Sequence, residues 1–136
     1  MRKCGLASFF FLLVLAIAMA LACGSPAHRL LQSVSISPTS ADADGNPVQF
    51  TATGDYDTSP FQVTPLTATW GACYQDGPTA LVSVSTKGLA QCKPGSDGTY
   101  TVWAWAPSGE QVCPQVCAAC GGCGCAVVGT AQLTCP

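Results

Sequence analysis

Short runs of alternating apolar and polar residues, separated by turn residues, recur along this chain from Ser33 to Cys135. Alternation of this kind is typical of β-strands, because successive side chains of a strand point to opposite faces. The 14 Gly and 10 Pro of the sequence supply frequent breaks between the runs. Outside the N-terminus, no long stretch has helical spacing. The pattern therefore predicts an all-β fold built from many short strands.

The expected strands share this period of two and place their larger apolar side chains on one face. They are residues 33–37, 47–54, 66–70, 81–85, 89–92, 99–106 and 126–135. The run from Leu66 to Trp70 ends on the largest apolar side chain, and a buried Trp dominates any small core that it enters. We therefore expect Trp70 at the centre of a small β-sandwich, with the other strands packed over it.

The N-terminus has the pattern of an export signal. Two basic residues precede a long uncharged apolar stretch, which ends in small residues. The segment Ala20-Leu21-Ala22-Cys23 resembles the bacterial lipobox, where lipoproteins are cleaved and the Cys thiol receives a diacylglyceryl group. The resemblance implies a signal peptide at 1–22, lipidation of Cys23 and a lipid-anchored tether at 23–32.

A protein processed in this way is exported to the cell envelope. Its partner there is the membrane, reached through the lipid on Cys23, at the outer membrane or the cell surface. Plain secretion is the alternative. An uncleaved anchor is disfavoured, because a spanning helix needs about 20 apolar residues.

Composition argues against several functional classes. Charged residues make up only 9% of the chain, and three scattered bases remain beyond the signal, which gives no footprint for nucleic acid. The only His, His28, lies in the expected tether and has no carboxylate beside it. The acids stand singly in turns, so no catalytic triad or carboxylate pair emerges. We predict that the protein is not an enzyme and uses no cofactor.

Eight cysteines remain when Cys4 and Cys23 are set aside, and an even number in an exported chain is typical of a disulfide framework. They are Cys73, Cys92, Cys113, Cys117, Cys120, Cys123, Cys125 and Cys135. Cys73 and Cys92 stand apart from the others and flank one strand and its turn, so we expect them to pair. Cys135 is expected to reach back into the cluster.

The cluster from Cys113 to Cys125 leaves two further interpretations open. Overlapping CxxC units suit zinc ligation only partly, since structural zinc sites usually use two CxxC pairs separated by a folded stretch. A redox couple at Cys117 and Cys120, or at Cys120 and Cys123, would usually need a helix N-terminus. The intervening glycines oppose such a helix. We prefer a disulfide-stapled loop that has no apolar core of its own.

Five short motifs occur in an order and spacing that is similar to one known family. They are Gln49-Phe50-Thr51-Ala52-Thr53-Gly54 with Tyr56, Ala68-Thr69-Trp70, Val82-Ser83-Val84-Ser85, Gly88-Leu89-Ala90 and Gly98-Thr99-Tyr100-Thr101-Val102. Together they resemble the bacterial immunoglobulin-like domain, group 2 (BIG2). The resemblance implies a seven-strand immunoglobulin-like β-sandwich over 33–136, as in bacterial surface proteins and adhesins, where such domains often act as spacers without catalytic residues. The Cys-rich insert at 107–125, a disulfide-rich loop before the last strand, departs from the family.

Trp103 and Trp105 lie on one face of the strand at 99–106, opposite Tyr100 and Val102. Two exposed indoles would form an apolar patch that usually marks a contact, here with a glycan or a protein. We prefer the alternative that the insert folds back and covers them, because it begins at the end of the same strand. A register shift of one residue would instead place them in the core.

The expected function is therefore that of an envelope-anchored lipoprotein whose single immunoglobulin-like module has a structural or adhesive surface role. A glycan- or protein-binding module that uses Trp103 and Trp105 is the alternative. A thiol redox or metal-binding protein is the weaker third hypothesis.

Overall fold

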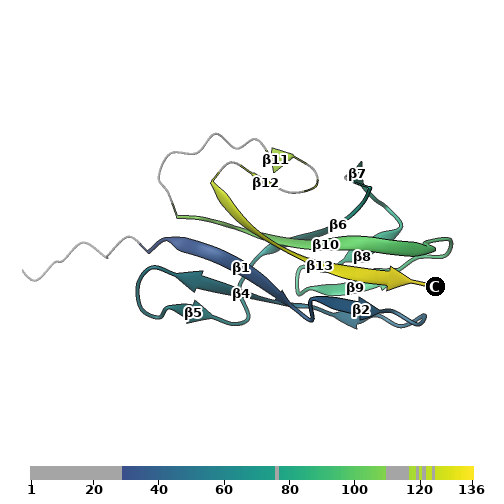
Figure 1. Cartoon of the computed structure of the whole chain (residues 1–136), viewed down its shortest axis with the longest axis horizontal. Helices are drawn as coiled ribbons and strands as arrows, with labels where there is room; N and C mark the ends of the chain where they lie inside the picture. The colour runs from purple at the N-terminus through teal and green to yellow at the C-terminus, as the bar shows by residue number, and fades with distance from the viewer. Residues whose placement is uncertain (1–28, 76, 110–116, 119, 121, 124) are drawn as a thin grey trace, which may run out of the picture.

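The computed structural model describes residues 29–75, 77–109, 117–118, 120, 122–123 and 125–136, with the backbone alone at 117–118 and 122–123. All regular elements in these residues are strands (Figure 1). They are β1 (Leu31–Ser37), β2 (Ser40–Asp42), β3 (Val48–Gln49), β4 (Thr51–Tyr56), β5 (Gln62–Val63), β6 (Thr69–Tyr74), β7 (Gly77–Pro78), β8 (Val82–Val84), β9 (Leu89–Cys92), β10 (Gly98–Pro107), β11 (Cys117–Ala118), β12 (Gly122–Cys123) and β13 (Ala126–Cys135). No helix long and apolar enough to cross a membrane occurs in these ranges.

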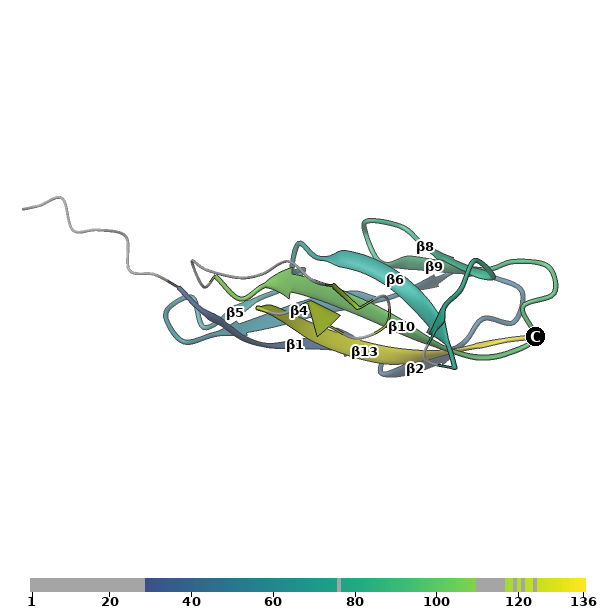
Figure 2. The ribbon, with the colours of Figure 1, turned by 90° about the horizontal axis from the view of Figure 1, so that it is seen from above.

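The strands lie in two packed layers, which Figure 2 shows from above. One layer is a five-stranded sheet in the order β2-β13-β10-β6-β7. The other layer contains two three-stranded sheets, in the orders β1-β4-β5 and β3-β9-β8. Only Phe50 separates β3 from β4, and its amide donates to the Gly88 carbonyl at 2.9 Å. A single extended segment therefore connects the two smaller sheets.

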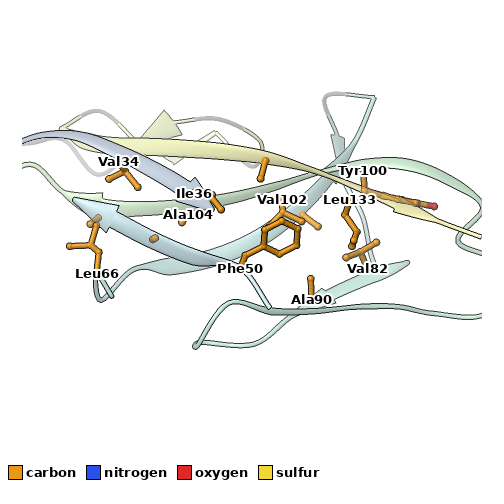
Figure 3. Close-up of a cluster of buried hydrophobic side chains, with 14 of the residues drawn as sticks. Val34, Ile36, Phe50, Leu66, Val82, Ala90, Tyr100, Val102, Ala104 and Leu133 are labelled. Carbon is orange, nitrogen blue, oxygen red and sulfur yellow. The ribbon is translucent and has the colours of Figure 1, made fainter. Parts of the chain in front are cut away.

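The longest ladder, between β10 and β13, supplies much of the core. Tyr100 lies opposite Leu133, and Val102 lies opposite Ala131. All four side chains are buried. Phe50, which is fully buried, faces them from the other layer (Figure 3). Apolar side chains from both layers thus meet between the sheets, which is why one face of each strand had to be apolar.

The prediction of an all-β fold is confirmed, and the long strands have nearly the expected bounds. The register of β10 is also as expected, with Tyr100, Val102 and Ala104 buried. The described residues contain more strand segments than the seven implied by the family resemblance. Breaks at Pro38 and Phe50 contribute to this, and β2, β5 and β7 are too short to give a periodic signal.

The predicted strand at 66–70 is wrong in its bounds. Leu66 is buried but lies outside any strand, and its amide donates to the Ala52 carbonyl of β4 at 2.8 Å. Trp70 belongs to β6 of the five-stranded sheet, where it lies opposite Ala104 of the neighbouring strand β10, whereas β4 lies in the other layer. The chain therefore crosses between the layers within a segment whose alternation suggested one strand.

The prediction that Trp70 forms the centre of the sandwich is wrong as well. Trp70 packs against the core but is only partly buried. The largest fully buried side chains are Tyr100, Phe50, Leu133 and Val102. Because β6 lies toward one side of its sheet, its largest side chain reaches the margin of the core.

Candidate binding sites and their disulfide framework

Two disulfides join strands that are distant in the sequence. Cys73 of β6 bonds to Cys120 of the insert, and Cys92 of β9 bonds to Cys135 of β13. The predicted Cys73–Cys92 pair is therefore wrong, as is the prediction that Cys135 bonds within the cluster. The reason is topological, since Cys92 lies in the layer opposite β13 while Cys73 faces away from the core. The Cys92–Cys135 bond consequently links the two layers.

The remaining cysteines are only partly described. Cys125 is also disulfide-bonded. Cys23 and Cys113 lie outside the described residues, as do the side chains of Cys117 and Cys123. The backbone of Cys117 pairs with that of Cys123 in the β11–β12 ladder.

The bond from Cys120 to Cys73 bears directly on the redox hypothesis. Both suggested couples, Cys117 with Cys120 and Cys120 with Cys123, require Cys120 to bond within its own CxxC unit. Its partner instead lies on the sheet. The disulfide therefore acts as an attachment point for the insert, and neither couple is formed.

Trp103 and Trp105 lie on the outer face of the five-stranded sheet, together with Cys73. Trp103 lies opposite Gly71 in β6, and Trp105 lies opposite Thr69. Both indoles are partly buried, so the face is not an open aromatic platform. The Trp103 ring lies so close to Gly71 that a Cβ on that glycine would be 2.2 Å from Cζ2.

The described part of the insert lies over this same face. The Cys73–Cys120 bond attaches it there, and β11 and β12 lie beside the β10–β13 ladder in Figure 1. The Nε1 atom of Trp103 is buried and has no hydrogen-bond partner in the described part of the chain. These positions favour the interpretation that the insert covers the indoles, and they argue against a glycan or protein site built on both of them.

A groove of about 510 Å³ opens elsewhere, where the chain crosses between the layers. Its apolar lining is the partly exposed Trp70 with the buried Phe50 and Leu66, and its polar lining includes Thr51, Thr67 and Lys87. The volume lies within the range of roughly 300–1,000 Å³ that small-molecule sites occupy. Sequence analysis missed this site because it assigned Trp70 to the core and treated the threonines as ordinary outward residues of strands.

Gly88 allows the groove to form. It has φ of +81°, and a Cβ at this position would lie 2.3 Å from the Phe50 carbonyl oxygen and 2.9 Å from Cζ2 of Trp70. Only glycine combines this left-handed backbone with so close an approach. The Lys87-Gly88 turn thus brings Lys87 to the rim beside Trp70.

The N-terminal end of the domain is held by polar contacts that the sequence did not indicate. The Arg29 guanidinium lies 3.6 Å from the centre of the Tyr56 ring and donates to the carbonyls of Thr58 and Pro60. Leu31 is buried, so the folded domain includes residues that were expected to belong to the tether. His28 lies outside the described residues.

Asp55 forms a second polar cluster nearby. The Gln62 amide donates to Oδ1 at 2.9 Å, and the Ser33 hydroxyl donates to Oδ2 at 2.7 Å. These bonds, that of Gln62 first, hold the pKa of the Asp55 carboxyl below its ordinary value of 3.8. The arrangement is structural, because it joins β1, β4 and β5.

The described residues offer little for metal or acid–base chemistry. Among them, no group of three or more His, Cys, Asp or Glu side chains is placed to hold a metal ion. The groove, in contrast, combines an aromatic wall with hydroxyl groups and one cation, which suits noncovalent binding. No family model matches this sequence, and none of the curated proteins compared with it is similar.

Proposed function

We propose that the protein is an exported, lipid-anchored envelope module with an immunoglobulin-like β-sandwich and a structural or adhesive role. The strand order of the two layers is the observation that carries the immunoglobulin-like part of the proposal. The alternative function through Trp103 and Trp105 is not favoured, because the insert is attached over that face.

The strand order supports the immunoglobulin-like arrangement. If β3 and β4 are taken as one strand, the first layer has the order β1, β4/β3, β9, β8, and the second contains β13, β10 and β6. These correspond to strands A, B, E and D, and to G, F and C, of immunoglobulin sheets. The short β2 pairs in parallel with β13 at the margin of the second layer. The sequence motifs of the BIG2 resemblance fall on or beside β3/β4, β6, β8, β9 and β10, which take the places of strands B, C, D, E and F.

The disulfides and the N-terminal segment support export. Disulfides persist in oxidising compartments, so the bonds at Cys73 and Cys92 suit a protein outside the cytoplasm. Only five residues, 24–28, separate Cys23 from Arg29, the first residue that the structure describes. At no more than about 3.6 Å per residue, a lipid on Cys23 would keep this end of the domain close to the membrane.

Intact mass spectrometry tests the proposal. The protein is extracted with detergent from the membranes of a bacterial host that processes lipoproteins, without reductant. We expect a chain that begins at Cys23, carries a lipid adduct and lacks eight hydrogens relative to the reduced form. The matched control is Cys23→Ala, which should lack the adduct and should no longer be found in the membrane fraction. A wild-type mass without an adduct would contradict the lipid anchor, and free thiols would contradict four disulfides.

A further inference from the structure

We propose that the groove beside Trp70 is a carbohydrate site that takes a sugar bearing a carboxylate. The site is independent of the lipid anchor and of the Trp103 face. Some polar groups of the groove are already hydrogen-bonded within the protein, and the others are left to bind a ligand.

Part of the backbone around the groove is already hydrogen-bonded. The Phe50 amide donates to the Gly88 carbonyl, and the Leu66 amide donates to the Ala52 carbonyl. The Gln49 side-chain amide donates to the carbonyls of Phe50 and Lys87, at 2.6 and 2.7 Å. An extended peptide would need free backbone groups of this kind to add as a strand. These bonds occupy part of the backbone that a peptide strand would need.

The side chains, in contrast, are free to bond. No hydrogen bond between described residues engages the hydroxyls of Thr51 and Thr67, which line the groove. The indole nitrogen of Trp70 has no such bond among the described residues either, and it is not fully buried. An aromatic wall beside free hydroxyl and N–H groups matches a sugar, which presents C–H faces and many hydroxyls.

The charge of the groove selects among sugars. Lys87 is the one charged residue among those that line it, and no carboxylate accompanies it. The chain as a whole has more acids than bases, so this positive rim is a local departure from the surrounding charge. A sugar carboxylate placed at the rim can accept charge-assisted hydrogen bonds from the Lys87 ammonium.

Titration with trigalacturonate and with its methyl ester tests the proposal on the full exported chain. Tryptophan fluorescence and saturation-transfer NMR report binding independently. We expect a saturable response to trigalacturonate and a weaker one to the ester, which has the same ring but no charge. Lys87→Gln should weaken trigalacturonate binding about fivefold and leave the ester unchanged, since an exposed charge pair contributes up to about 1 kcal/mol. The backbone carbonyl used by Gln49 is retained in this variant.

Two further variants locate the site. Trp70→Phe should abolish the fluorescence response and reduce the NMR signal, whereas Trp105→Phe, on the other face, should leave binding unchanged. Thr67→Val removes an exposed hydroxyl at nearly constant shape and serves if Trp70→Phe does not fold. The proposal is overturned if trigalacturonate gives no saturable response by either method. It is also overturned if Lys87→Gln and Thr67→Val bind as the wild type does.

Discussion

Removal of the disulfide between Cys92 and Cys135 should lower the free energy of unfolding by about 4 kcal/mol. The bond joins β9 in one layer to β13 in the other, across a sequence separation of 43 residues. A cross-link that closes a loop of this length lowers the entropy of the unfolded chain by an amount worth about 4 kcal/mol at 25 °C. That is a large fraction of the roughly 5–15 kcal/mol that stabilises an ordinary domain.

The assay is guanidinium unfolding of the double variant Cys92→Ala/Cys135→Ala, followed by tryptophan fluorescence. The matched variant is Cys73→Ala/Cys120→Ala, whose sequence separation of 47 residues predicts nearly the same loss. The two variants should differ in the native state, because only the second detaches the insert from the face that carries Trp103. Acrylamide should therefore quench native fluorescence more strongly in the Cys73→Ala/Cys120→Ala variant alone.

Two results would refute this reasoning. A loss below about 1 kcal/mol for Cys92→Ala/Cys135→Ala would show that the cross-link does not constrain the unfolded chain as the loop-closure model requires. Equal quenching in the two double variants would show that the Cys73–Cys120 bond does not hold the insert over Trp103. Peptide mapping of the unreduced wild type provides the control for the pairing itself.

Two other predictions concern single side chains. In the same unfolding assay, Gly71→Ala should destabilise the domain by about 1–3 kcal/mol, because the new Cβ would displace the Trp103 ring. The control variant Gly77→Ala should be nearly neutral, because the nearest atom outside its chain neighbours would lie 3.7 Å from the new Cβ. Equal stability of the two variants would contradict the close packing of Trp103 on β6. The depressed pKa of Asp55 predicts that its contribution to stability is complete above the ordinary value of 3.8 and is lost as the pH falls through the lower folded value. Between about pH 5 and about pH 2, the free energy of unfolding should therefore change less with pH in Asp55→Asn than in the wild type. The same change with pH in both proteins would contradict the depressed pKa of Asp55.

The strands that the sequence predicted best are those whose whole length lies in one sheet. Buried side chains alternate with more exposed ones along β10 and from Gly129 onward in β13, so Tyr100 and Leu133 could be placed in the core from the pattern alone. The same pattern of alternation gave a wrong strand prediction for the run from Leu66 to Trp70. Its alternation is real, but the chain changes layers within it, and periodicity carries no information about which sheet a residue joins.

The candidate site was predicted less well than the fold. Trp103 and Trp105 were correctly placed on the outward face of their strand, yet the groove at Trp70 was missed. Its lining comes from segments around residues 49–52, 65–70 and 86–87, which are brought together by the crossing of the chain and by the turn at Gly88. No single stretch of the sequence contains enough of the groove to reveal it.

The sequence by itself determined the all-β class, most strand positions and the inward face of each long strand, because these depend on a local period of two and on turn residues. Only the tertiary structure decided which cysteines pair, where Trp70 lies and what covers Trp103. A disulfide needs two Cα atoms at a suitable distance, here 5.8 Å for Cys73–Cys120 and 5.9 Å for Cys92–Cys135. That proximity arises from the order of the strands in the two layers, which depends on residues far apart in the chain.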